Sequence, residues 1–157
     1  MVRALYPGSF DPVTFGHLDL VERALRLFDS VTVAAAENIA KQPVFTLAER
    51  LELLRAVLPA RVQVVTFRGL VVDYCRAHGF DVIVRGLRTM SDFEYEYQMA
   101  LTNRHLNPAV ETVFVMPNLQ FSYVSSSLIK DVVRNGGDVS TYLPPPVEKA
   151  LRAKLSS

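Results

Sequence analysis

Hydrophobic and polar residues follow two different periods along this chain, and each change of period marks the boundary of an expected element. Five short apolar runs, bounded by glycine, proline or polar residues, have the length and composition of buried strands. They cover residues 2–6, 31–36, 62–67, 80–84 and 112–116. The second run carries no charge, which is typical of a strand that is covered on both faces.

The segments between these runs carry apolar residues at the spacing of amphipathic helices. Helices are expected over residues 17–28, 46–57, 70–79, 91–106 and 125–135, and from Pro146 onward. Thr46 with Glu49, and Ser91 with Glu94, have the spacing of a capping box, so each pair should open a helix. Gly79 can end the third helix.

Strand and helix therefore alternate five times, and 157 residues fit one domain. This order predicts an α/β fold, a single doubly wound domain over 1–157 with a five-stranded parallel sheet and helices on both faces. Ligands of such sheets bind beyond the carboxyl ends of the strands. The loops to inspect are therefore residues 7–16, 37–45, 68–69, 85–90 and 117–124.

Composition narrows the possible partners. Half of the residues are hydrophobic and the formal net charge is +1, which argues against disorder, nucleic-acid coating and an electrostatic membrane anchor. No apolar run reaches the roughly 18 residues that a membrane span requires. The single cysteine, Cys75, cannot form an internal disulfide and is expected in the core. We therefore expect a soluble, cytoplasmic protein.

The loop after the first strand has the chemistry of a phosphate site, although it matches neither the Walker nor the dinucleotide glycine pattern. Gly8 allows close backbone approach, and Ser9 supplies a hydroxyl. Gly16 and His17 stand at a helix start, where free N–H groups favour anions. The alternative is a capped helix with a surface histidine.

Other loops add compatible groups at the same pole of the sheet. Arg85 and Arg88 follow the fourth strand, and guanidinium groups match phosphate oxygens. Three serines at 125–127, with Lys130 one turn on, precede a helix, although one of them should simply cap it. Lys41 lies in the break after the second strand. A solvated arginine pair and a solvated Lys41 are the alternatives, but the convergence favours a polyphosphate ligand.

Two motifs make the resemblance specific. Thr14-Phe15-Gly16-His17 resembles the (H/T)-x-G-H signature of the nucleotidyltransferase superfamily, and residues 124–130 resemble its I-S-S-S-x-x-K/R motif. Residues 6–12, 85–88, 92–96, 103–105 and 137–139 are similar to the bacterial phosphopantetheine adenylyltransferase family. The resemblance covers essentially the whole chain and implies the Rossmann-like nucleotidyltransferase fold.

The resemblance implies that ATP and 4′-phosphopantetheine give dephospho-coenzyme A and pyrophosphate, assisted by Mg²⁺. The substrate phosphate is already an anionic nucleophile, so the protein needs only to align it and to stabilise charge at the α-phosphate. Two alternatives stay open: transfer of an adenylyl or cytidylyl group to another phosphate acceptor, and a nucleotide sensor without catalysis.

Site residues follow from the resemblance, motif by motif. The catalytic group would be His17, Lys41 and Arg88. The phosphopantetheine site would be formed by Ser9, Lys41, Val71 and Arg85. The ATP site would be formed by Ser9, Phe10, His17, Gly86, Leu87, Arg88, Glu96, Phe121, Ser122, Tyr123, Val124, Ser125, Ser126 and Ser127. Glu96 would accept from a ribose hydroxyl or help to organise the metal, or it is an ordinary surface charge. No protein metal ligand is assigned.

The resemblance also implies a homohexamer and feedback inhibition by coenzyme A. Tyr95, Tyr97, Met99 and Leu101 make the long helix unusually rich in large groups, so either core packing or a subunit interface is expected there. Phe15 and Phe121 depart from some relatives, which should change the fit of the ligand without loss of activity.

Overall fold

The computed structural model describes residues 1–39 and 42–156, and within them five strands form one parallel sheet. The strands are β1 (Arg3–Gly8), β2 (Ser30–Ala36), β3 (Gln63–Phe67), β4 (Val82–Gly86) and β5 (Glu111–Val115). Their order across the sheet is β3-β2-β1-β4-β5, and every neighbouring pair is parallel. The predicted five-stranded doubly wound sheet is confirmed.

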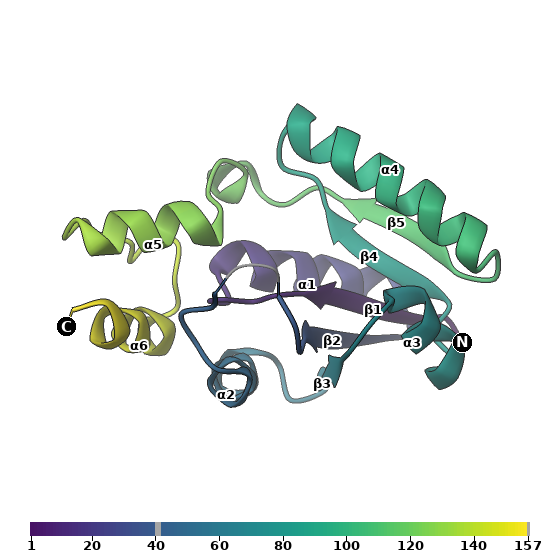
Figure 1. The fold of residues 1–157 in the computed structure, drawn as a ribbon, viewed down its shortest axis with the longest axis horizontal. Helices are drawn as coiled ribbons and strands as arrows, with labels where there is room; N and C mark the ends of the chain where they lie inside the picture. Colours follow the sequence, from purple (N-terminus) through teal and green to yellow (C-terminus); the bar gives the residue numbers. More distant parts are fainter. Residues whose placement is uncertain (40–41, 157) are drawn as a thin grey trace.

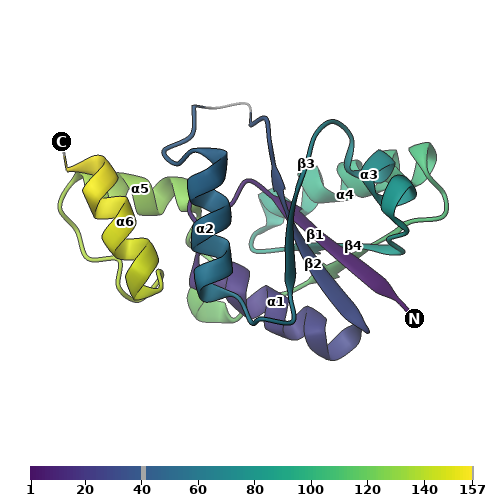
Figure 2. The same cartoon turned by 90° about the horizontal axis from the view of Figure 1, so that it is seen from below.

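Six α-helices and one short 3₁₀-helix connect and flank the strands in the described part of the chain (Figure 1). They are α1 (Phe15–Leu27), α2 (Leu47–Val57), α3 (Val71–His78), α4 (Met90–Leu106), η1 (Leu119–Phe121), α5 (Ser126–Arg134) and α6 (Pro145–Leu155). Helices α5 and α6 lie together at one end of the molecule, and α6 also contacts α2 (Figure 2).

Alternation along each strand divides the core into two clusters. Ala4 and Tyr6 of β1 pack with buried residues of α1, α2, α5 and α6, whereas Leu5 between them packs with Val72 and Cys75 of α3 on the opposite face. Successive side chains of a strand point to opposite faces, so a buried run without charges is what a two-sided sheet requires. Cys75 is buried in the core, as expected.

Helix starts agree with the sequence in one case and differ in another. The capping box of Thr46 and Glu49 is present and opens α2. The box expected from Ser91 and Glu94 is wrong, because α4 begins at Met90 and Thr89 is its N-cap, accepting the Asp92 N–H at 3.3 Å. The extended backbone that a cap requires lies at Thr89, two residues earlier than expected.

Helix ends are marked as glycine chemistry predicts. Gly79 follows α3 with a φ of 73°, the left-handed conformation that glycine adopts without a steric cost.

The last helix begins at Pro145, one residue before the expected Pro146, because Pro144 serves as its cap. None of the described helices is both long and apolar enough to span a bilayer.

Candidate active site

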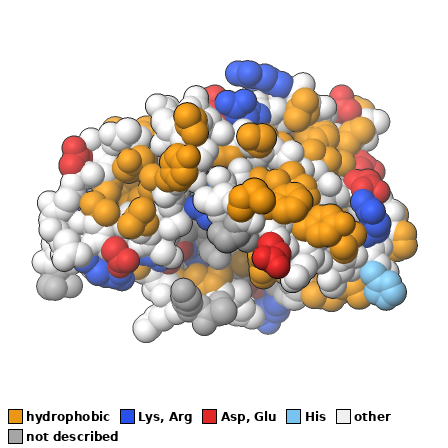
Figure 3. Space-filling view, turned by 90° about the horizontal axis from the view of Figure 1, so that it is seen from above, with side chains coloured by type: hydrophobic (Ala, Val, Ile, Leu, Met, Phe, Trp, Pro, Cys, Tyr) orange, Lys and Arg blue, Asp and Glu red, His pale blue; other side chains and the backbone are white. Residues whose placement is uncertain are grey.

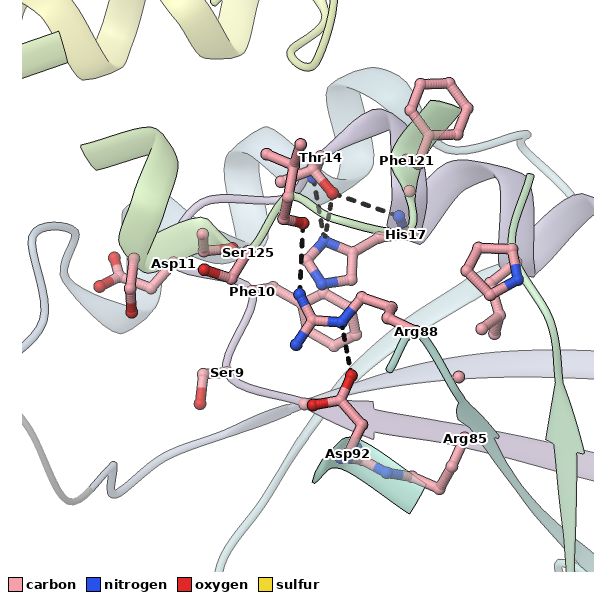
Figure 4. A pocket seen from close by; sticks show the side chains of 18 of the residues that line it. Ser9, Phe10, Asp11, Thr14, His17, Arg85, Arg88, Asp92, Phe121 and Ser125 are labelled. Atoms are coloured by element: carbon pink, nitrogen blue, oxygen red, sulfur yellow. Dashed lines mark hydrogen bonds and ion pairs between the residues drawn. The ribbon is translucent and has the colours of Figure 1, made fainter. Parts of the chain in front are cut away.

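A cavity of about 520 Å³ opens at the carboxyl ends of β1 and β4, the neighbouring strands at which the order of the sheet reverses (Figure 4). Its walls come from the loops after β1, β2, β4 and β5 and from the first turn of α5. Many of the lining residues are polar or charged: Ser9, Asp11, Thr14, His17, Gln42, Arg85, Arg88, Asp92, Glu96, Ser125, Ser126, Ser127 and Lys130. This is where an open α/β sheet binds its ligand.

His17 is held in a defined orientation at the start of α1. Its Nδ1 accepts the backbone N–H of Thr14 at 2.9 Å, while its own backbone N–H donates to the Thr14 hydroxyl at 3.3 Å. The histidine thus takes the place that Glu or Gln has in an ordinary capping box. The Phe10 ring packs against the imidazole edge-on, with centroids 4.9 Å apart. The ring is therefore held by the Thr14 N–H and the Phe10 ring before any ligand arrives.

The His17 imidazole is neutral around pH 7. Burial, followed by the positive charges of Arg88 and Arg85, lowers its pKa from the ordinary value of 6.5 to about 3. With Nδ1 accepting from Thr14, the single ring proton is on Nε2. His17 can therefore donate a hydrogen bond to an anionic oxygen and is a poor proton shuttle.

Arg85 and Glu96 form a bidentate ion pair on one wall of the cavity. Arg85 Nε donates to Glu96 Oε2 at 2.9 Å, its Nη2 donates to Oε1, and its Nη1 donates to the Pro7 carbonyl at 2.8 Å. Burial alone would lower the pKa of Arg85, but the hydrogen bond and charge of Glu96 outweigh it and the pKa is raised. Burial also raises the pKa of the neighbouring Tyr6 phenol to about 12. In this arrangement Glu96 is engaged by Arg85.

Arg88 connects two walls of the cavity, and Figure 4 shows its guanidinium beside the His17 ring and Asp92. Its Nε pairs with Asp92 at 3.0 Å and its Nη1 donates to the Val124 carbonyl at 3.2 Å. The loop after β4 is thereby tied to the segment that precedes α5. Free guanidinium N–H groups remain for a ligand, because Arg carries five of them.

The serines that precede α5 have separate roles. Ser125 is the N-cap and accepts the Leu128 N–H at 3.1 Å, which confirms that one serine of the run caps the helix. Ser126 Oγ donates to the Pro12 carbonyl at 3.0 Å and joins α5 to the loop after β1. All three serines line the cavity, so the positive end of the α5 dipole faces it.

The expected site residues lie in three places. The cavity is lined by Ser9, Phe10, His17, Arg85, Gly86, Arg88, Glu96, Phe121, Val124, Ser125, Ser126 and Ser127. Four others do not line it: Val71, Leu87, Ser122 and Tyr123. Val71 begins α3 and packs against the cluster around Leu5, and Tyr123 is exposed. Lys41 lies outside the described residues, so its assignment stays a prediction.

Several residues of the site were missed from the sequence. Asp11, Thr14 and Asp92 line the cavity. They form hydrogen bonds with Val44, His17 and Arg88, respectively. All three fall inside the stretches that resemble the family, residues 6–12, 14–17 and 92–96, and this was the available signal. Gly86 was expected as a ligand contact, yet it also allows close packing: a Cβ there would lie 2.7 Å from Leu20 Cδ1 of α1.

The carboxylates of the cavity offer no dedicated metal site. Asp11 pairs with Lys130, Asp92 with Arg88 and Glu96 with Arg85. Among the described residues, no three His, Cys, Asp or Glu side chains gather as metal ligands. The residues present fit a metal only as part of a bound nucleotide, since Mg²⁺ is often held by phosphates and water with one or two carboxylates.

A parallel sheet with a phosphate-compatible cavity at its switch point defines a nucleotide-binding α/β protein, and the family comparison agrees. The cytidylyltransferase-like family model matches residues 5–132. Two solved structures share the fold. A lipopolysaccharide core biosynthesis protein from Thermoplasma volcanium has a TM-score of 0.58 and 22% identity, covering 75% of this chain and 98% of its own. A Vibrio parahaemolyticus protein, provisionally titled a nicotinate-nucleotide adenylyltransferase, has a TM-score of 0.69 and 19% identity, covering 100% of this chain and 98% of its own.

The sequence comparison is more specific. A relative from Opitutus terrae, named phosphopantetheine adenylyltransferase, is 54% identical over 155 residues, which cover 98% of this chain and 97% of that protein. The chain belongs to the phosphopantetheine adenylyltransferase family, within the cytidylyltransferase-like nucleotidyltransferases.

Proposed function

We propose that this protein transfers the adenylyl group of ATP to 4′-phosphopantetheine, forming dephospho-coenzyme A and pyrophosphate in coenzyme A biosynthesis. Family membership supports the reaction. The observation that carries it in the structure is the meeting of His17, Arg88 and the start of α5 at one cavity, although they come from distant parts of the chain. These groups match a polyphosphate in charge and in hydrogen bonding.

The chemistry requires alignment and charge stabilisation. An oxygen of the phosphopantetheine phosphate attacks the α-phosphorus of ATP, a new P–O bond forms, and the bond to the pyrophosphate leaving group breaks. His17 donates its Nε2–H to an α-phosphate oxygen and stabilises the charge that builds up there. Arg88 and the start of α5 receive the leaving phosphates. No protein nucleophile is required, because the acceptor is already an anion.

The two substrates would occupy different sides of the cavity. ATP would lie along Phe10, His17, Gly86, Arg88, Phe121 and residues 124–127, which line the cavity. Phosphopantetheine would lie toward Ser9, Lys41 and Arg85, with its arm toward Val71. Mg²⁺ would arrive with the nucleotide and neutralise phosphate charge, since the cavity carboxylates are already paired with cations.

Assembly and location form part of the same proposal. A homohexamer is supported by the large side chains exposed on α4, which Figure 3 shows as apolar atoms on the face seen from above. They are Met90, Phe93, Tyr95, Tyr97, Met99, Leu101 and Leu106. A cytoplasmic location is supported by the biosynthetic reaction and by a single, buried, free cysteine. Inhibition by coenzyme A is expected because the product of the pathway shares the phosphopantetheine arm.

An acceptor-dependent assay tests the proposal. Purified protein is incubated with ATP, Mg²⁺ and 4′-phosphopantetheine, and pyrophosphate release is measured with and without the acceptor. Release that needs both ATP and 4′-phosphopantetheine supports the function. Faster turnover with CTP, or with another phosphate acceptor, would assign a different transferase reaction. ATP binding without release for any acceptor would indicate a sensor.

A further inference from the structure

Asp11 has no role in the reaction described above, yet it is one of the few buried charged residues among those described. Its side chain is 5% exposed and receives three hydrogen bonds. The backbone N–H groups of Val44 and Phe45 donate to its two carboxylate oxygens, each at 2.9 Å, and Lys130 Nζ donates at 3.2 Å. The donors come from two segments that are 33 and 119 residues away in the sequence.

These contacts join three walls of the cavity at one carboxylate. Asp11 itself follows Phe10 in the loop after β1. Val44 and Phe45 end the loop after β2, three and four residues beyond Lys41 in the sequence. Lys130 is on α5, one turn from its N-terminus. A displacement of any one of these segments would therefore change the shape of the site on two sides.

Other bonds brace the same segments without replacing Asp11. Ser126 Oγ donates to the Pro12 carbonyl at 3.0 Å. The buried guanidinium of Arg50, on α2, donates to the carbonyls of Ser9 and Ala36 at 2.8 and 2.9 Å. Both braces end on carbonyls, so only Asp11 satisfies the N–H groups of Val44 and Phe45 in this cluster.

The pairing also explains a motif residue that the proposed reaction leaves unused. Lys130, in the serine motif before α5, was considered as a phosphate ligand from its spacing alone. Its side chain is 17% exposed and bonded to Asp11. A partly buried lysine beside a buried carboxylate is held by that partner, since the carboxylate charge alone would be costly to bury.

We propose that Asp11, neutralised by Lys130, is a positioning residue that holds the loop after β2 and the start of α5 in register with the β1 loop. The inference rests on the proposed adenylyl transfer. It predicts that loss of the Asp11 carboxylate misplaces the groups that align phosphopantetheine, so the acceptor KM rises and kcat falls, while the KM for ATP changes less.

The test compares Asp11→Asn with a matched control, Asp138→Asn. Asp138 also accepts a backbone N–H, from Ser140 at 2.9 Å, but it is exposed and remote from the cavity. At a temperature where both variants are folded by circular dichroism, D11N should lower kcat/KM for phosphopantetheine by about 10- to 100-fold, because small misplacements of reacting groups are costly. D138N should remain within about twofold of wild type.

Amide exchange supplies a readout that does not depend on activity. In D11N the Val44 and Phe45 amides should exchange faster than in wild type, while amides within β1 and β4 stay unchanged. Faster amide exchange together with wild-type kcat and KM values would show that Asp11 has a purely structural role and would overturn the proposal. Unchanged exchange would overturn it as well. Wild-type protein that releases no pyrophosphate would instead contradict the proposed function.

A charge-neutral variant keeps the test valid if D11N does not fold. D11N/K130M removes both charges and leaves no unpaired ion. If the two residues act as one unit, K130M should show the same kinetic pattern as D11N in weaker form. The double variant should lose no more kcat/KM for phosphopantetheine than D11N does. If D11N is unfolded, the double variant should still show the raised acceptor KM. A selective rise in the KM for ATP in K130M, or additive losses, would overturn the coupling.

Discussion

The backbone N–H of Thr14 donates to Nδ1 of His17 at 2.9 Å, and this one bond decides which way the histidine can act. An imidazole that accepts at Nδ1 and is neutral must carry its proton on Nε2. Because this bond is part of the capping arrangement of α1, the same contact that caps the helix also selects the tautomer. The donor for the phosphate is thus oriented by the local structure.

Replacement of His17 should reduce turnover without loss of the fold. His17→Ala removes the Nε2 donor, and kcat for pyrophosphate release should fall by about 10²–10³, as for removal of one oxyanion donor. His17→Gln retains an amide donor and should lose less. The KM for ATP should change less than kcat, since the bond is strongest in the transition state. Steady-state kinetics with both substrates varied measure this, and wild-type turnover in H17A would refute the role.

Stability should also depend on pH through His17. Its pKa is about 3 in the folded protein, against an ordinary value of 6.5, so between these values the unfolded chain takes up a proton that the folded protein does not. The contribution of His17 to the free energy of unfolding is therefore constant above pH 6.5. As the pH falls below 6.5, the free energy of unfolding decreases by at most about 1.4 kcal/mol per pH unit.

Urea unfolding of wild type and His17→Gln from pH 8 to pH 5 isolates this effect. The variant lacks the titrating group, so the stability of wild type relative to it should fall below pH 6.5. A difference that is constant over the whole range would contradict a neutral buried imidazole. Nitrogen-15 NMR should in parallel show the Nε2–H tautomer down to pH 5.

The Arg85–Glu96 pair should matter for both stability and acceptor binding. Glu96→Ala leaves Arg85 without its partner on a largely buried wall. The free energy of unfolding should fall by an amount toward the lower end of about 3–5 kcal/mol, because Arg85 remains 32% exposed. The freed guanidinium should also lose its orientation and raise the KM for phosphopantetheine. Glu94→Ala, two residues earlier on α4 and exposed, is the matched control. Equal effects of the two substitutions on urea midpoints would show that the pair contributes nothing.

The exposed face of α4 predicts an assembly that one charge can disrupt. Phe93 and Tyr97 stack with centroids 5.7 Å apart, and Tyr95 and Met99 are 60% and 40% exposed. Met99→Glu should lower the molar mass measured by sedimentation velocity, because a carboxylate is costly to bury at an apolar interface. Lys149→Glu, on α6, is the control. A monomeric wild-type protein would refute the expected hexamer.

The architecture could be predicted because each strand is a short apolar run and each helix a periodic one. Residues 31–36 carry no charge, which only a strand covered on both faces tolerates. Helix starts were harder to locate. Thr89 with Asp92 and Ser91 with Glu94 have the same spacing, and only the backbone conformation at Thr89 selects between them.

The site could be predicted in part for a topological reason. His17 and Arg88 follow different strands, and a parallel sheet brings the ends of its strands to one edge. The long-range hydrogen bonds that brace the cavity could not be predicted. The bonds from Val44 and Lys130 to Asp11 span 33 and 119 residues, and no local pattern encodes such distances. The engagement of Glu96 by Arg85 likewise depends on how α4 packs beside β4.

Gly86 provides the last prediction, because it sets how closely α1 approaches β4. A Cβ at this position would lie 2.7 Å from Leu20 Cδ1, and Leu20 is only 2% exposed, so it has little room to move. Gly86→Ala should therefore destabilise the protein by about 1–3 kcal/mol in urea unfolding. It should also lower kcat, since α1 carries His17 and the β4 loop carries Arg88. Gly16→Ala is the control for stability: its Cβ would meet nothing closer than 3.4 Å, and alanine is favoured in a helix, so its stability should equal or exceed that of wild type. Recovery of stability in G86A by Leu20→Val would assign the loss to this contact, whereas a G86A protein as stable as wild type would show that the helix can move away freely.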